Sequence, residues 1–187
     1  VFTQWGFTIA LVGYWLRGGR SLPSLGLGLA PSASLWVGLG LALAACAFLI
    51  LQVSAVRRHP EARAAVRGQI GALRPLLPHT EAEARWFTAV SLTAGTCEEV
   101  IYRGFLMAYF AGLGPGPAIV LSTLVFGLSH AYMGRAGAVR AGLVGLVVAG
   151  LYWLTGSLWA SMLLHATADV TSGIMARMGF APEPDEG

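Results

Sequence analysis

The chain has 187 residues, of which 56% are hydrophobic and only 11% are charged, and its mean hydropathy is +0.67. Soluble domains carry roughly 25% charged residues, so this chain has too little charge to cover a water-facing surface. Two cysteines inside apolar stretches exclude a secreted disulfide scaffold. The formal net charge is +3, and all twelve basic residues are Arg, clustered between apolar runs. We therefore expect no nucleic-acid partner, and we predict a single membrane domain over residues 1–187.

Six segments are candidates for membrane-spanning helices, because such a helix needs about 20 mostly apolar residues to cross the hydrocarbon core. The predicted fold class is thus an all-α, polytopic transmembrane bundle. The first segment is short, and the chain does not begin with Met, which is consistent with a helix that starts before Val1. The six predicted segments cover residues 1–16, 34–56, 85–110, 117–133, 138–155 and 158–178.

Residues 57–84 form the one long polar segment, with five Arg and three Pro residues. The prolines predict a short interfacial helix between two turns. The excess of Arg predicts a cytoplasmic basic loop, because loops rich in basic residues stay inside. With this orientation nine arginines lie inside, and Arg17 and Arg20 lie outside. We therefore expect a multi-pass protein of the cell membrane with both termini in the cytoplasm and core helices at 85–178.

Charged residues cluster in the third predicted helix, where each would cost several kcal/mol if it faced lipid. Glu99 and Arg103 are four residues apart, so they share a helix face and can pair. Glu98 lies about 100° around the helix and lacks that partner, so its carboxylate is suited to accept a proton. A packing network between helices is the alternative for all three residues.

Two further helices carry polar residues of the same kind. His130 follows an apolar run in the fourth segment, and a lone His in such a helix is more often a hydrogen-bonded core residue than a catalytic one. In the sixth segment His165 and Asp169 are again four residues apart, so the carboxylate can orient the imidazole. An isolated pair that satisfies itself is the alternative.

Together these residues predict one site around a single water molecule, and two chemistries fit it. Zinc is the candidate cofactor, since two histidines and a carboxylate (Glu98, His130 and His165) could bind Zn²⁺ and leave one position open for water. Alternatively, Glu98 and His130 activate the water directly, while His165 and Asp169 stabilise the developing oxyanion. Both chemistries are hydrolytic, and the spacing differs from the H-E-x-x-H of common zinc proteases.

The three motifs in order resemble those of the CPBP family, the CAAX protease and bacteriocin-processing group of intramembrane endopeptidases, also called the Abi family. Its motif set is E-E-x-x-x-R, then F-x-x-x-H, then H-x-x-x-D/N, each in a membrane helix. In this chain the motifs begin at Glu98, Phe126 and His165, and the resemblance covers residues 85–172.

The resemblance implies proteolysis at a membrane-buried site open to the cytoplasm, with a peptide or protein substrate that can be lipidated. In type II prenyl-protein members the first Glu and the second-motif His activate water, which implies these roles for Glu98 and His130. The family is described both as metalloproteases and as metal-free glutamate proteases. Asp169 stands where prenyl-protease members carry Asn, so an oxyanion role requires that it be protonated. The implied supporting residues are Glu99 and Arg103, and the implied oxyanion residues are His165 and Asp169.

Other functions fit parts of the pattern. Intramembrane Glu, His and Asp also serve as proton relays in transporters, although the two halves of this chain show no internal repeat. A non-enzymatic immunity or partner protein of the membrane is a third reading. Cys97, beside Glu98, is a candidate nucleophile, although buried free cysteines are commonly apolar fillers. No G-x-S-x-G sequence indicates a serine nucleophile.

Overall fold

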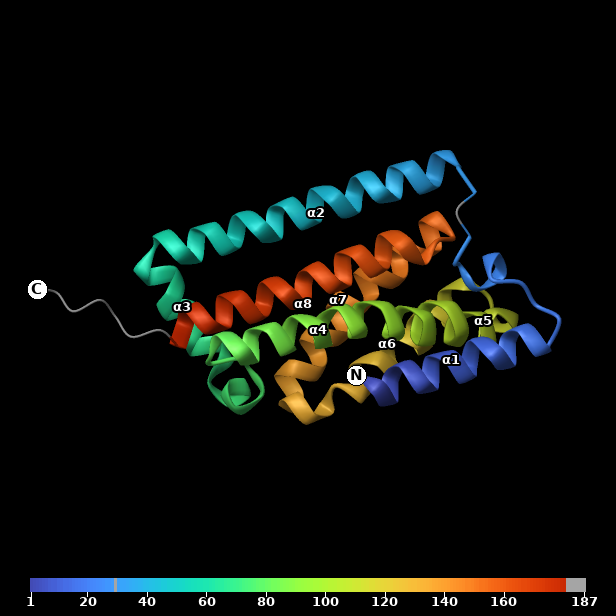
Figure 1. Ribbon diagram of the computed structural model, residues 1–187. Helices are drawn as coiled ribbons and strands as arrows, with labels where there is room; N and C mark the ends of the chain where they lie inside the picture. Colours follow the sequence, from blue (N-terminus) through green and yellow to red (C-terminus); the bar gives the residue numbers. More distant parts are fainter. Residues whose placement is uncertain (29, 181–187) are drawn as a thin grey trace, which may run out of the picture.

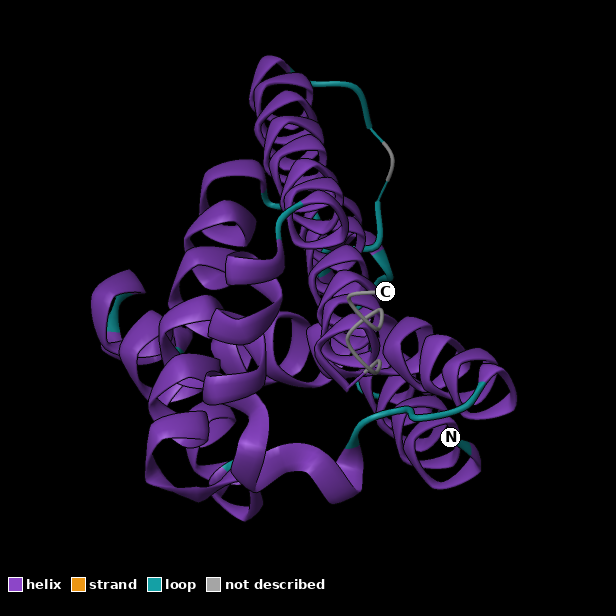
Figure 2. Cartoon of the chain, turned by 90° about the vertical axis from the view of Figure 1, so that its left-hand side faces the viewer, coloured by secondary structure: helices purple, strands orange, loops and turns teal. Residues whose placement is uncertain are grey.

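The computed structural model describes residues 1–28 and 30–180, and within these residues all regular structure is helical, with no strand (Figures 1 and 2). The predicted all-α fold is therefore confirmed, while the end of the predicted domain and the tail at residues 181–187 lie outside the described part. The helices are α1 (Phe2–Arg17), α2 (Ala33–Arg58), α3 (Pro60–Ile70), α4 (Glu81–Glu98), the π-helical segment η3 (Glu99–Leu106), α5 (Met107–Tyr109), α6 (Pro115–Ser129), α7 (Gly134–Thr155) and α8 (Leu158–Phe180).

Helices occur at all six predicted positions, but the fourth ends earlier than predicted and the third contains a π-helical stretch. The prediction placed His130 inside a helix over residues 117–133, but α6 ends at Ser129. The backbone N–H of His130 donates to the Gly127 carbonyl, which tightens the last turn. A 3-10 turn (Ala131–Met133) then leads to Gly134, whose φ of 77° suits glycine and redirects the chain into α7.

Two helical stretches are long and apolar enough to cross a membrane, namely Ala33–Arg58 and Ala131–Thr155. The other long helices carry polar side chains that reduce their hydropathy, and in α4 and α8 several of these side chains are buried inside the protein. Large apolar side chains such as Trp36, Phe48 and Val147 are instead exposed on the outside of the bundle. This inverted distribution is typical of a helical membrane protein.

Helix α8 lies at the centre of the bundle, with α2 along one side and α4 along the other (Figure 1). Helix α4 packs tightly on α8 at Gly95, where an added Cβ atom would lie 2.7 Å from the Ala166 Cβ atom and 2.7 Å from the Ala166 backbone nitrogen. Small residues permit such close helix packing in membranes. This contact brings the end of α4 beside the His165 turn of α8.

The polar segment contains a short helix, α3, which packs on the C-terminal end of α8. The Arg67 Nε atom donates a hydrogen bond to the Gly179 carbonyl at 2.8 Å. Helix α4 then begins at a capping box, in which Thr80 accepts from the Glu83 backbone N–H and the Glu83 carboxylate accepts in return. Backbone donors at His79 and Thr80 hold the pKa of Glu83 below its ordinary value. These contacts fix α3 to α8 and define the start of α4.

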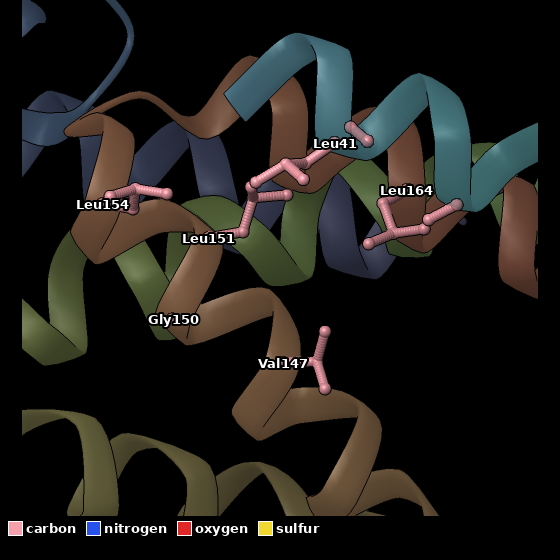
Figure 3. Close-up of a pocket in the computed structure, with 8 residues that line it drawn as sticks. Leu41, Val147, Gly150, Leu151, Leu154 and Leu164 are labelled. Atoms are coloured by element: carbon pink, nitrogen blue, oxygen red, sulfur yellow. The ribbon is translucent and has the colours of Figure 1, made fainter. Parts of the chain in front are cut away.

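A cavity of about 230 Å³ opens between α2, α7 and α8 (Figure 3). Its walls carry only apolar side chains, so it offers no group for acid–base or nucleophilic chemistry. Leu41 and Leu164 line it from facing helices, and Gly150 leaves one wall open. The side chains that can carry out acid–base chemistry lie instead on α4, on α8 and after the end of α6.

Candidate active site

Glu98 and Glu99 lie where the α-helix of α4 changes into the π-helical segment η3. A π-helix is rare, and it is found most often at functional sites because its wider turn changes the direction of side chains. Glu99 is 0% exposed and Arg103 is 1% exposed, so both ionisable side chains are removed from water and lipid.

The predicted pair of Glu99 and Arg103 is present, with 2.8 Å between the Arg103 Nη1 and Glu99 Oε1 atoms. The Arg103 Nη2 atom also donates to the Gly145 carbonyl at 2.9 Å, and the guanidinium carbon lies 4.3 Å from the centre of the Phe126 ring. Arg103 therefore connects η3 to both α6 and α7. An extra Cβ atom at Gly145 would lie 3.0 Å from Nη2, so glycine leaves room for this contact.

Glu99 has a second partner that the sequence did not predict. The His165 Nδ1 atom lies 2.7 Å from the same Glu99 Oε1 atom that binds Arg103. Because an ionised carboxylate only accepts hydrogen bonds, Nδ1 carries the proton, and Nε2 is left to face the site. Sequence spacing could not reveal this bond, since the two residues are 66 positions apart.

His130 is held in the same manner by a different acceptor. Its Nδ1 atom lies 2.8 Å from the Phe126 carbonyl oxygen, which can only accept, so Nδ1 donates and Nε2 is free to face inward. The Ser129 hydroxyl donates to the same carbonyl at 2.7 Å. The imidazoles of His130 and His165 are thus both held in place by a hydrogen bond at Nδ1, and in both the Nε2 atom faces Glu98.

The two Nε2 atoms meet at Glu98. The Glu98 Oε2 atom lies 4.0 Å from His130 Nε2 and 3.9 Å from His165 Nε2. This oxygen is buried and has no hydrogen-bond partner among the described residues. The sequence predicted that these three residues converge, and the structure brings them together from α4, α8 and the turn after α6.

The other Glu98 oxygen has a partner that sequence reasoning missed. The Gln4 side-chain amide of α1 donates to Glu98 Oε1 at 3.0 Å. The sequence did contain an indication of this contact: Gln4 is a polar residue in an apolar predicted membrane helix, and such residues usually face the protein interior. Glu98 is therefore not without a partner, contrary to the expectation from helix spacing alone.

Asp169 lies on the other side of His165 from Glu99. Its Oδ2 atom is 3.6 Å from His165 Nε2, and its side chain is 40% exposed. The predicted proximity of the two residues is present, but the atom that fixes the imidazole at Nδ1 belongs to Glu99. Asp169 instead contributes negative charge at the edge of the site.

The zinc hypothesis can be tested against these distances. With zinc–ligand bonds of about 2.0–2.1 Å, neighbouring atoms of a tetrahedral site lie about 3.4 Å apart. The separations of 3.9 and 4.0 Å at Glu98 Oε2 are longer. Within residues 1–28 and 30–180, no group of three His, Cys, Asp or Glu side chains is arranged to hold a metal ion. Glu98, His130 and His165, as they are placed, do not fit zinc.

Comparison with known proteins supports the motif assignment. Residues 80–171 match the family model described as type II CAAX prenyl endopeptidase Rce1-like, a segment that includes every motif residue above. Neither the curated proteins nor the solved structures include a match to the chain. The chain therefore contains a domain of the Rce1-like family of type II CAAX prenyl endopeptidases over residues 80–171.

Proposed function

We propose that this protein is an intramembrane endopeptidase that hydrolyses a peptide bond with water activated by Glu98. One observation carries the proposal: an unpartnered, buried carboxylate oxygen lies about equally far from two imidazole nitrogens, 4.0 Å and 3.9 Å away. A water molecule bound among these three atoms could be polarised from several directions. The family match independently favours proteolysis.

In the proposed reaction Glu98 Oε2 takes a proton from water while the water oxygen attacks the carbonyl carbon of the substrate. His130 Nε2 accepts a hydrogen bond from the same water and orients it. When His165 is doubly protonated, Nδ1 donates to Glu99 and Nε2 donates to the oxyanion of the tetrahedral intermediate. The proton on Glu98 then moves to the amide nitrogen as the carbon–nitrogen bond breaks.

Glu99 and Arg103 support this reaction without touching the substrate. Glu99 orients His165 and balances its positive charge, in the way that a carboxylate orients a catalytic histidine. Arg103 neutralises Glu99 and fixes it to α7 through Gly145. Asp169, near His165 Nε2, favours the protonated imidazole.

We further propose that all six long helical segments lie in the membrane and that the site opens to the cytoplasm. His130 directly follows α6, in the turn that leads to Arg135 and Arg140. Positively charged turns favour the cytoplasmic side, which supports a position of His130 near the inner surface. The partly exposed Asp169 side chain lies at the same site.

The substrate class that fits best is a protein or peptide with a lipidated CAAX-type end. The family match carries this inference, and an apolar cleft of about 290 Å³ between α1, η3 and α8 agrees with it. Trp5 and Val100 line the cleft, and they are close in sequence to Gln4 and Glu98. Such a cleft suits an apolar chain attached near the scissile bond.

The experiment is cleavage of a fluorescence-quenched peptide with a farnesylated CAAX end by the protein in lipid vesicles. We expect Glu98→Gln and His130→Ala each to reduce kcat by about 10²- to 10⁴-fold, because general acid–base catalysis contributes a factor of this size. Gly40→Ala, which contacts nothing within 4 Å, is the matched control with wild-type activity. Full activity of either site variant, or no cleavage by folded wild type, would contradict the proposal.

The same preparation distinguishes the other readings. Metal analysis with a chelator titration separates zinc chemistry from the carboxylate reaction, and we expect activity to persist after chelation. Proton flux into vesicles that depends on Glu98, without proteolysis, would instead identify a transporter. A Cys97→Ala variant should remain active, because that thiol is fully buried.

A further inference from the structure

Helix α1 lies outside the segment that matches the family model, yet it contacts the candidate catalytic carboxylate. Gln4 comes from the first turn of α1, and its Nε2 atom donates to Glu98 Oε1 over a distance of 3.0 Å. The same helix is fixed to α4 one residue later, where the Trp5 indole N–H donates to the Thr93 hydroxyl at 3.3 Å. Two neighbouring contacts therefore hold α1 against the catalytic turn.

The hydrogen bond distinguishes the two oxygens of Glu98. Oε1 accepts from Gln4, whereas Oε2 has no partner within the described residues and faces the two histidines. A carboxylate on a flexible side chain can rotate, and a donor on one oxygen restricts that rotation. A neutral donor also stabilises the ionised carboxylate, which is the form that accepts a proton from water.

We propose that Gln4 is a positioning residue that orients Glu98 and keeps it ionised for the reaction, an inference that rests on the proposed function for its catalytic consequence. No other described side chain donates to Oε1. The Gln4 hydrogen bond favours the ionised form of Glu98, whereas the negative charges of Glu99 and Asp169 disfavour it. The other titratable or charged groups that act on Glu98 are His130, His165, Asp169, Glu99, Arg103, Tyr132 and Cys97.

The test replaces Gln4 by Met, which keeps the length of the side chain and removes the donor. Thr93→Val is the matched control, because it removes the neighbouring hydrogen bond between α1 and α4 and changes neither Glu98 nor the lining of the apolar cleft. With the farnesylated peptide, we expect Gln4→Met to reduce kcat by about tenfold with KM unchanged. Thr93→Val should retain wild-type kcat, and equal losses in both variants would indicate a merely structural role.

A second readout requires no substrate. Dicyclohexylcarbodiimide modifies protonated carboxyl groups in apolar surroundings, and peptide mapping can assign the product to Glu98. Without the Gln4 donor the carboxylate binds a proton more readily, so we expect the labelling midpoint to move to higher pH by about one unit. Thr93→Val should show the wild-type midpoint. An unchanged midpoint in Gln4→Met overturns the inference.

The two readouts separate failure of the inference from failure of the proposed function. If Glu98→Gln is inactive and Gln4→Met matches the wild type in kcat and in labelling, the role of Gln4 is wrong and the proposed reaction stands. If Glu98→Gln remains fully active while the labelling midpoint of Gln4→Met moves, the hydrogen bond is real but the proposed reaction is wrong.

Discussion

Glu99 performs two tasks with one oxygen atom. Its Oε1 atom accepts from Arg103 at 2.8 Å and from His165 at 2.7 Å, and the side chain is completely buried. The arrangement combines a structural ion pair with the orientation of a site histidine. Changing Glu99 alone should therefore affect both the stability and the activity of the protein. A second change at Arg103 can distinguish the two effects.

We expect Glu99→Gln to destabilise the protein strongly, because removal of one partner of a buried ion pair costs about 3–5 kcal/mol. The double variant Glu99→Gln/Arg103→Leu should recover much of the thermal stability, since it leaves no unpaired buried charge. Its activity should stay low, because His165 still lacks an anionic partner at Nδ1. Thermal unfolding in detergent, together with peptide cleavage, checks both parts.

Two results would contradict this interpretation. Wild-type stability of the single variant would show that the ion pair contributes little. Recovery of activity in the double variant, in parallel with stability, would show that Glu99 serves the fold alone and does not orient His165.

At the scale of whole helices, the packing of α4 on α8 sets the distance between Glu98 and the histidine of α8. Gly95 lies one helical turn before the carboxylates, and Ala166 directly follows His165. A Cβ atom at position 95 would meet backbone atoms of Ala166 as close as 2.7 Å, so relief requires movement of a whole helix. The geometry of the site therefore depends on a glycine that has no chemistry of its own.

We expect Gly95→Ala to reduce both the melting temperature and kcat, since separation of the two helices also increases the distance from Glu98 to His165. The second-site change Ala166→Gly should not restore activity, because the backbone nitrogen and Cα atoms at 2.7 and 2.8 Å remain in place. Melting curves and cleavage rates of the single and double variants test this. Full rescue by Ala166→Gly would show that only the two methyl groups collide.

The sequence predicted the helices well because apolar runs of membrane length are separated by turns and charges. It also predicted the pairing of Glu99 with Arg103, since residues four apart share one face. The contact of Glu99 with His165 could not be predicted, because nothing in either local sequence encodes a contact across 66 positions. The π-helical segment was missed for a related reason, as periodicity arguments assume 3.6 residues in each turn.

Over the whole molecule, the arrangement of charges predicts an orientation that no contact within the bundle determines. Residues 57–84 and the turn at Arg135 are expected inside, and the uncharged turn at residues 111–114 is expected outside. Gly68 and Gly112 lie in these opposite regions, and neither has a neighbour within 4 Å of an added Cβ atom. Both positions therefore accept a cysteine probe without a clash.

We expect a cysteine at position 68 (Gly68→Cys) to react with a membrane-impermeant maleimide only after the cells are opened, and Gly112→Cys to react in intact cells. The two natural cysteines are free and buried, and replacing both by Ala provides an unreactive background. The labelling is checked by gel shift in intact and lysed cells. The reverse pattern at the two positions would invert the proposed orientation.

The π-helical segment has a consequence for how this protein can vary. A π-turn contains more residues than an α-turn, so deleting one residue between Glu99 and Leu106 would let the stretch relax to an ordinary helix while the helices before and after it keep their relative orientation. A deletion inside α4 would instead rotate Glu98 and Glu99 by about 100° relative to the start of that helix and away from His165. A change of length is therefore accommodated within the π-helical stretch, whereas the α-helix before it cannot lose a residue without moving the carboxylates.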